Sequence, residues 1–229
     1  PGQMGGVATA NLLLGKANPG GKLPVTFPAS ATAYPQYDPN CNPSIITSNP
    51  PVDGNCPLYP GVYKLGFLGV SNHNYKTIDF TTNGIFVGYR WYDKHDVTPL
   101  FAFGHGLSYT TFNYSRKLTV ARAADGGLDV KVSVRNMGPM DGDEVVQVYL
   151  GAGQVPAGVQ MAEKALVGFE RLSLKKGQTQ VVTIHIAPRQ LSYWSVAAHD
   201  WVQATGLRSI MVGSASDDIR ATTAINFGN

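Results

Sequence analysis

The sequence predicts a short α/β segment over residues 1–112, followed by an all-β sandwich over residues 113–229. Apolar residues recur at helical spacing near the start of the chain, whereas short apolar strands separated by turns follow residue 115. In addition, 43% of the 229 residues are hydrophobic, which is enough for one sizeable core or two modest ones.

The opening segment has the pattern of a helix followed by a strand. Apolar residues lie at helical spacing within residues 3–14, and Gly15 is placed to end that helix. Residues 22–28 then have the pattern of a short strand. Residues 29–79 contain many Pro, Asn, Tyr and Gly residues, which predicts a long loop packed on another part of the protein. Because the chain starts at Pro1, without a Met, and a helical pattern follows at once, we expect the start to be a cut within a larger polypeptide.

The second part of the chain is predicted to be a β-sandwich. Residues 128–134 show the clearest alternation, as expected for a strand with one face on a core and the other in water. The predicted strands are 117–123, 128–135, 144–150, 164–174, 178–186, 194–203, 209–213 and 219–227. Such a series is typical of immunoglobulin or fibronectin type III sandwiches, and the lack of the antibody Cys and Trp pattern favours the fibronectin-like type.

Charge and motif content argue against several functions. Lys and Arg number 18 against 15 Asp and Glu, without a basic run, so we expect no nucleic-acid partner. No stretch of about eighteen apolar residues occurs, so no membrane span is expected. The sequence contains no nucleophile-elbow pattern, no phosphate-binding glycine loop after a strand, and no Cys or His pair at zinc spacing. We therefore expect no metal site.

The only two cysteines are Cys41 and Cys56. They flank a loop rich in Pro, Asn, Ser and Gly, where a disulfide would tether about fifteen residues and contribute about 3 kcal/mol through loop entropy. Such a bond would imply a secreted or periplasmic location. Two unrelated free thiols are the alternative.

One segment, residues 84–112, carries a specific resemblance. It reads GIFVGYRWYDKHDVTPLFAFGHGLSYTTF and resembles the passage of family 3 glycoside hydrolases from the second catalytic domain into a C-terminal fibronectin type III-like domain. Residues 1–3 and 14–24 resemble the last helix and strand of that family's α/β sandwich domain. Further matches lie at 134–138, 142–150 and 164–169. The resemblance is greatest to β-glucosidases and covers nearly all of the chain.

The resemblance implies a retaining β-glycosidase that hydrolyses terminal non-reducing β-linked sugars. Such enzymes use two carboxyl groups about 5 Å apart, one as nucleophile and one as general acid/base. The resemblance places the nucleophilic aspartate on an N-terminal barrel outside this chain. We therefore expect the barrel-containing portion of the same enzyme as the partner, a β-linked sugar as the substrate, and no activity from the chain alone. No cofactor is expected, because carboxyl groups suffice for the chemistry.

At the position of the family's acid/base glutamate this chain has Asn83. An amide cannot donate a proton at a useful pKa, so the usual acid is absent if the alignment holds. Three explanations remain open: an introduced substitution, a natural loss or relocation of the acid, and an error in the alignment register. Candidates for a relocated acid are Asp79, Asp93, His95 and Asp96, although four ionisable residues in a loop are most often a solvated surface.

The residues that follow Asn83 are candidates for substrate binding. In the family, residues two and three positions after the acid/base line the subsite for the aglycone, and these are Ile85 and Phe86 here. Their apolar side chains suit the non-polar face of a sugar ring or an aromatic aglycone. The alternative is core packing within a strand over residues 85–87. Residues 90–92 could likewise offer polar and stacking groups or hold a buried Arg against a carboxylate.

Aromatic residues near Gly104 and Gly106 predict a packed seam between the two parts of the chain. Its expected members are Phe101, Phe103, Leu107, Tyr109 and Phe112. We interpret His105 as a hydrogen-bonded structural imidazole rather than a catalytic base.

Two other classes of function remain open. A carbohydrate-binding or interaction module would present an exposed row of aromatic side chains, for which Tyr193, Trp194 and Trp201 are available. A catalytically dead homologue that binds sugars is the second possibility, and Asn83 is the feature that favours it.

Overall fold

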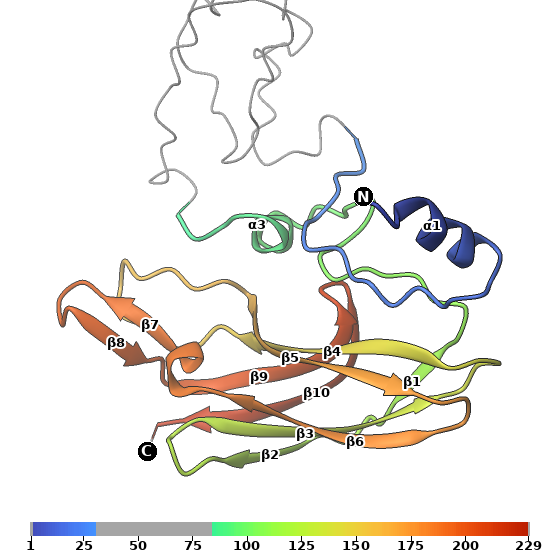
Figure 1. Cartoon of the computed structure of the whole chain (residues 1–229). Coiled ribbons are helices and arrows are strands. Elements are labelled where there is room, and N and C mark those ends of the chain that lie inside the picture. Colours follow the sequence, from blue (N-terminus) through green and yellow to red (C-terminus); the bar gives the residue numbers. More distant parts are fainter. Residues whose placement is uncertain (1, 31–83, 229) are drawn as a thin grey trace, which may run out of the picture.

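The computed structural model describes residues 2–30 and 84–228, which form a two-sheet β-sandwich with a helix and a crossing linker attached to it (Figure 1). The cysteine pair, Asn83 and Asp79 lie outside the described residues, as does nearly all of the predicted 29–79 loop. The fold class predicted from the sequence is confirmed.

All strand pairs of the sandwich are antiparallel. In the first sheet, β3 pairs with β6 along one edge and with both β1 and β2 along the other. Its strands are β1 (Phe112–Tyr114), β2 (Thr119–Arg122), β3 (Leu128–Asn136) and β6 (Thr179–Ile186). The second sheet has the order β10-β9-β4-β5. Its strands are β4 (Gly142–Gly151), β5 (Lys164–Leu174), β9 (Gly206–Ala215) and β10 (Asp218–Phe227).

One predicted strand, over residues 194–203, is wrong. The chain instead forms a 3-10 helix, η1 (Pro188–Leu191), and a hairpin of β7 (Ser192–Ser195) and β8 (Asp200–Gln203). His199 closes the turn with a φ of 50°, a left-handed conformation for which the sequence offers no glycine signal. The short strand β1 was not predicted at all.

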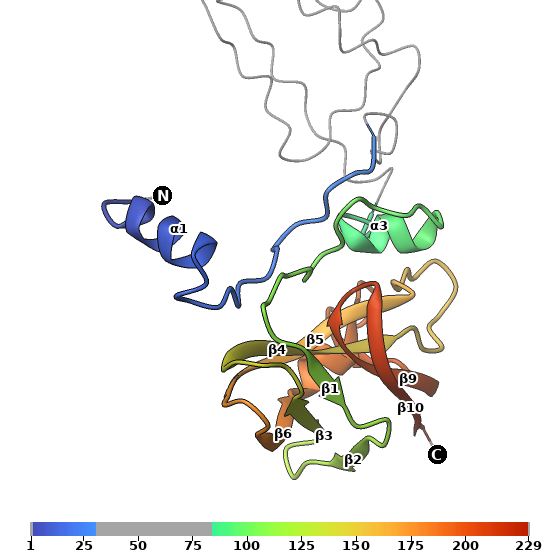
Figure 2. The same ribbon diagram turned by 90° about the vertical axis from the view of Figure 1, so that its right-hand side faces the viewer.

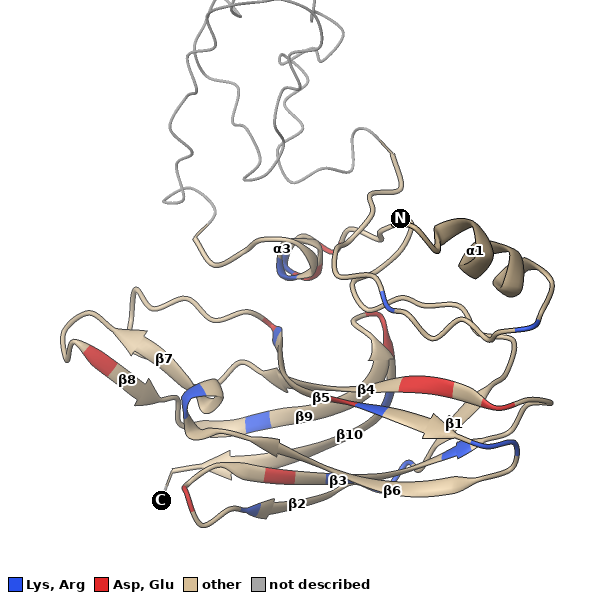
Figure 3. Cartoon of the chain, viewed as in Figure 1, with Lys and Arg blue, Asp and Glu red and all other residues tan. Residues whose placement is uncertain are grey.

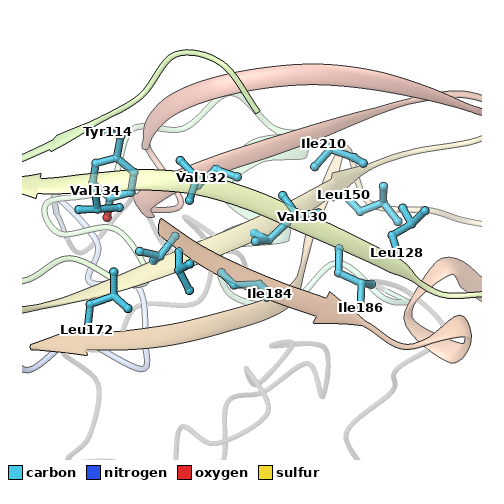
Figure 4. Packing of buried hydrophobic residues seen from close by; sticks show 14 of the residues in the cluster. Tyr114, Leu128, Val130, Val132, Val134, Leu150, Leu172, Ile184, Ile186 and Ile210 are labelled. Carbon is cyan, nitrogen blue, oxygen red and sulfur yellow. The ribbon is translucent and has the colours of Figure 1, made fainter. Parts of the chain in front are cut away.

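Apolar side chains from the facing sides of the two sheets form the core (Figure 4). Along β3, the inward residues alternate with outward ones and are 0–2% exposed, as for Val130 and Val132. Burial of one such aliphatic side chain contributes about 1.5 to 3 kcal/mol to folding. The core therefore stabilises the sandwich against which the preceding segments lie.

Adjacent valines on β6 allow a direct test of this core. Val182 faces inward and is 6% exposed, whereas Val181 faces outward and is 64% exposed. Val182→Ala is expected to lower the free energy of unfolding by about 2 kcal/mol, because it removes buried methyl groups and leaves a cavity. Val181→Ala is the control and should stay within about 0.5 kcal/mol. Equal losses in urea denaturation would contradict the assigned register.

His185, on the outer face of β6, lies between two carboxylates. Its Nδ1 is 2.8 Å from Asp129 Oδ1 and its Nε2 is 3.0 Å from Asp125 Oδ2. The hydrogen bond with Asp129, helped by the charge of Asp125, raises the pKa of His185 above the ordinary 6.5.

Because the folded pKa of His185 exceeds the unfolded one, its contribution to stability is present below the unfolded pKa and is lost as pH rises through the folded value. We expect the stability advantage of the wild type over His185→Gln to shrink between about pH 6 and about pH 8. Thermal midpoints at the two pH values check this, and an advantage independent of pH would contradict it.

The predicted opening helix forms as α1 (Gly5–Leu13), and Gly15 follows it with a φ of 67°. No residue of α1 is buried, and the helix stands away from the sandwich (Figure 2). The predicted strand over residues 22–28 is wrong. That segment makes a single bridge, Phe27 to Phe101, because Pro24 and Pro28 have no N–H to continue a ladder.

Candidate functional site

A compact turn, residues 84–88, leads into helix α3 (Tyr89–Lys94). Gly84 and Gly88 have φ values of 55° and 58°, in the left-handed region that glycine adopts without strain. Between them, the Val87 N–H donates to the Ile85 carbonyl at 3.1 Å. The backbone conformation at the two glycines therefore determines how residues 85–87, which carry the three apolar side chains, are oriented. The alternative prediction of a strand over residues 85–87 is wrong.

The two predicted subsite residues have different environments. Ile85 is 37% exposed, whereas Phe86 is 8% exposed. The Nζ atom of Lys94 lies 3.7 Å from the centroid of the Phe86 ring, in a cation–π contact. The Ile85 side chain is thus partly exposed in this chain, and the Phe86 side chain is largely covered. A role of either residue in substrate binding stays a prediction.

Helix α3 is fixed to the sandwich by contacts with β5. Asp93 Oδ1 and Lys164 Nζ form an ion pair at 2.5 Å, and the two side chains are only 18% and 17% exposed. The Leu166 N–H donates to the Tyr89 hydroxyl at 2.8 Å. Burial raises the pKa of Asp93, and the ion pair with Lys164 opposes that rise. Asp93 is therefore a structural partner of Lys164 rather than a free acid.

An aromatic stack continues this attachment. The rings of Tyr89 and Phe103 are stacked with centroids 4.9 Å apart, and Tyr89 meets Tyr149 edge-on at 6.0 Å. Tyr149 is fully buried, and its hydroxyl donates to Gln147 Oε1 at 2.6 Å. The predicted seam is confirmed at Phe103, and Phe112 packs against the core.

The seam prediction is wrong for Leu107 and Tyr109, which are 73% and 48% exposed. Tyr109 instead donates a hydrogen bond from its hydroxyl to the Leu12 carbonyl of α1, at 2.8 Å. Phe101 is 42% exposed and packs edge-on against Phe27 and at a tilt against His105. The linker thus ties α1 to the sandwich mainly through polar contacts.

Asn18 is central to those polar contacts. Its Nδ2 donates to the Asp141 carbonyl at 2.9 Å, and its Oδ1 accepts from the Ser108 hydroxyl and the Tyr109 N–H at 3.0 and 2.8 Å. One amide side chain therefore joins the opening segment, the linker and the sandwich.

Among the described residues, the candidates for a relocated acid, Asp93, His95 and Asp96, do not form a common cluster. His95 stacks on Trp91 with ring centroids 4.2 Å apart, and its Nδ1 lies 2.9 Å from the Trp91 carbonyl. Asp96 is exposed and ends α3 with a φ of 51°. Within residues 2–30 and 84–228, no group of three His, Cys, Asp or Glu residues could hold a metal ion. No helix in this described part is long and apolar enough to cross a membrane.

A cleft of about 420 Å³ lies where the linker meets the sandwich. The Lys22 ammonium and a Glu144 carboxylate oxygen, 2.8 Å apart, form an ion pair at its wall. None of the described residues 84–94 lines this cleft, so it is separate from the candidate site.

Charged residues of the described part are interspersed by sign over both sheets (Figure 3). The β7–β8 hairpin carries a pair of exposed aromatic side chains, Trp194 and Trp201, which are 47% and 42% exposed. These cross-strand partners have ring centroids 5.7 Å apart, and the Arg189 guanidinium lies 4.6 Å from the Trp201 ring. Tyr193 is partly buried.

Sequence reasoning missed the contacts that two residues of the sandwich, Lys164 and Gln160, make with the helix and the turn. Lys164 pairs with a residue 71 positions earlier in the chain, and Gln160 lies against Gly84. No local pattern marks either residue, because their role arises only from long-range packing.

Fold and site together define a fibronectin-like sandwich preceded by the end of an α/β domain. The family model of the glycosyl hydrolase family 3 C-terminal domain matches residues 1–109, and that of the fibronectin type III-like domain matches residues 144–216. The chain therefore belongs to glycoside hydrolase family 3 and corresponds to the C-terminal portion of its members.

Relatives and solved structures with beta-glucosidase names agree with this assignment. The chain is 36% identical over 222 residues to thermostable beta-glucosidase B of Acetivibrio thermocellus, covering 95% of this chain and 25% of that protein. It is similar in structure to DesR, a beta-glucosidase from Streptomyces venezuelae solved with D-glucose, with a TM-score of 0.75 and 39% identity over 96% of this chain and 24% of that one. Beta-glucosidase 3B of Thermotoga neapolitana, solved with glucose, gives a TM-score of 0.75 at 30% identity, covering 100% of this chain and 27% of that one. The chain thus spans about a quarter of the length of these relatives.

Proposed function

We propose that this chain is the C-terminal part of a retaining β-glucosidase that hydrolyses terminal non-reducing β-linked sugars. The observation that carries the proposal is that the chain matches β-glucosidases over 95% or more of its own length while covering about a quarter of theirs. In this role the turn at residues 84–88 supplies one wall of the active site. The sandwich braces that wall through Lys164 and Leu166.

The partner in this proposal is the barrel-containing N-terminal portion of the same enzyme. The exposed apolar side chains of the opening segment support it, because a soluble protein rarely leaves such residues unpacked. They include Met4, Val7, Leu13 and Leu14, which are 65%, 53%, 78% and 69% exposed. These side chains offer a surface for the remainder of the α/β domain.

Coexpression of the chain with the barrel-containing portion tests this proposal. The assembled enzyme is expected to hydrolyse an aryl β-glucoside with a good leaving group and to release β-glucose first, as seen by NMR, whereas each part alone should be inactive. If the two parts copurify and bind glucose in calorimetry but show no turnover, the chain belongs to a catalytically dead homologue that binds sugars. Turnover by the isolated chain would contradict the proposal outright.

We also propose a secreted or periplasmic location, on the basis of the two cysteines, which flank a segment that the sequence predicts to be a loop. Peptide mapping without reduction is expected to recover Cys41 and Cys56 in one linked fragment. Two freely alkylated thiols would contradict this part of the proposal.

An interaction module is the second candidate, favoured by the exposed Trp194 and Trp201 pair. It requires the isolated chain to be retarded by soluble β-glucan in affinity electrophoresis, and the retardation to disappear in Trp194→Ala/Trp201→Ala. The β-glucosidase proposal makes no such demand, so this measurement separates the two.

A further inference from the structure

The sequence contains one N-glycosylation pattern, Asn113-Tyr114-Ser115. An Asn followed by any residue except Pro and then by Ser or Thr is the acceptor pattern for N-linked glycans in secreted proteins. The pattern occurs once in the 229 residues, because Asn42-Pro43-Ser44 has a Pro in the middle position. A tripeptide recurs by chance in many proteins, so its use depends on where the fold places the Asn side chain.

The Asn113 side chain lies on the outer face of strand β1. Its neighbours Phe112 and Tyr114 pack on the core, and Tyr114 is only 5% exposed. Since successive side chains of a strand point to opposite faces, the Asn113 side chain points outward, where it is exposed. Within the described part of the chain this side chain has no hydrogen-bond or ion-pair partner. A glycan on its amide nitrogen would therefore displace no contact of the fold.

The surface around Asn113 is polar and lies away from the two helices. Across the sheet Asn113 pairs with Arg135 of β3, which pairs in turn with Thr179 of β6, and all three residues are exposed. In Figure 1 and Figure 2, α1 and α3 lie above the second sheet, and the first sheet lies below it. Because the N-terminal portion is expected to pack on the opening segment, a glycan on the outer face of the first sheet leaves that contact free.

Strand β1 is also an edge of its sheet. Within residues 2–30 and 84–228 it pairs only with β3, so the backbone groups along its other side have no strand partner. Exposed edges invite pairing with other chains, and natural proteins cover or interrupt them. Asn113 is the central residue of this strand, so a bulky group attached there would obstruct the approach of another strand.

We propose that Asn113 is the acceptor of an N-linked glycan, which covers the outer face of the first sheet beside Arg135 and the free edge of β1. The inference rests on the proposed secreted location, reached through a eukaryotic secretory pathway. In the transfer step, the Asn113 amide nitrogen attacks the anomeric carbon of an oligosaccharide linked to a lipid pyrophosphate, and loses a proton. The bond from nitrogen to the anomeric carbon forms as the bond from that carbon to the pyrophosphate oxygen breaks, and the lipid pyrophosphate leaves.

Peptide mapping tests the site without any need for activity. The chain and the barrel-containing portion are coexpressed behind signal peptides in a eukaryotic host, and enzyme from both the medium and the cell lysate is mapped. Treatment with a peptide N-glycosidase is expected to convert Asn113 to aspartate in the wild type and in Ser115→Thr, which keeps the pattern. Asn113→Gln and Ser115→Ala should lose the glycan. The matched control is Asn226→Gln, which changes an exposed Asn of β10 outside any such pattern and should keep the glycan.

An unmodified Asn113 in wild-type enzyme from both fractions would overturn the proposal. The same map reports whether Cys41 and Cys56 are linked, so failure of the proposed location and failure of the glycan are scored separately. A modified Asn113 in an assembled enzyme without turnover would support the site and contradict only the proposed function.

Two further measurements test where the glycan lies. Wild type and Asn113→Gln, both secreted by the same host, should copurify equally with the barrel-containing portion and have the same urea midpoint, because the Asn113 side chain makes no contact that is lost. On heating, light scattering should show slower aggregation of the glycosylated wild type, since the edge of β1 is covered. Weaker copurification of the glycosylated chain would mean that the N-terminal portion needs this face, and equal aggregation rates would mean that the edge is not covered. Either result would overturn the proposed position of the glycan.

Discussion

Replacing Asn83 by Glu is expected to raise the kcat of the assembled enzyme on an alkyl β-glucoside by about 10²- to 10⁴-fold, the usual contribution of general acid/base catalysis. An alkoxide leaves poorly without a proton, and the Asn83 amide cannot supply one. Asn83→Gln is the control, since it has the length of Glu but no ionisable group, and its kcat should stay close to that of the wild type.

A substrate with a better leaving group provides a control for the Asn83→Glu experiment. A dinitrophenolate departs without protonation, so hydrolysis of a dinitrophenyl β-glucoside should respond much less at the first, glycosylation step. Single-turnover release of the phenol measures that step. If Asn83→Glu leaves alkyl glucoside hydrolysis unchanged, then the acid is supplied by another group or the family alignment is out of register at this position.

Removing the ammonium in Lys164→Met is expected to lower the free energy of unfolding by about 3 kcal/mol, because it leaves the largely covered Asp93 carboxylate, 18% exposed, without its partner. The matched control is Arg171→Met, which breaks an ion pair with Asp143 in which Arg171 is 63% exposed. That change should cost less than about 1 kcal/mol. Urea denaturation of the two variants makes the comparison, and equal losses would contradict a structural role for the partly buried Lys164–Asp93 pair.

The pH dependence of Lys164→Met provides a second readout. Burial already raises the pKa of Asp93 in the folded chain, so the folded state binds more protons than the unfolded state between the unfolded and folded pKa values. This contribution favours folding at low pH and is lost as pH rises through the folded pKa. Without Lys164 the pKa should rise further, so the deficit of the variant should shrink toward acidic pH. A deficit independent of pH would mean that Asp93 keeps its charge stabilised in another way.

The sequence predictions that are confirmed depend on local backbone preferences and periodicity, and those that are wrong depend on other parts of the fold. Alternation along residues 128–134 correctly predicted β3, because a half-buried strand needs one apolar face. The end of α1 at Gly15 was predicted for a similarly local reason, the preference of glycine for a left-handed conformation. In contrast, the β7–β8 hairpin was missed because His199 takes the left-handed position without a glycine signal. Residues 22–28 have the pattern of a strand, but only one bridge forms there.

In the candidate site, too, the sequence identified the residues, whereas packing decided their surroundings. The motif over residues 84–112 carried the family resemblance, and the sequence alone identified Ile85 and Phe86 as candidates. Their environments were decided by packing, which left Ile85 open and placed Phe86 beneath the Lys94 ammonium. Phe86 and Lys94 are eight positions apart in the sequence, and their contact depends on how the chain turns between them.

The sequence by itself determined the class of the sandwich, the opening helix and the family, because these depend on local periodicity and on motifs that are read in order along the chain. Only the tertiary structure decided that Lys164 and Gln160 of the sandwich contact the helix and the turn of the candidate site. The physical reason is that contacts across some 70 positions arise from how the sheets and linker pack together, and local backbone preference does not encode them.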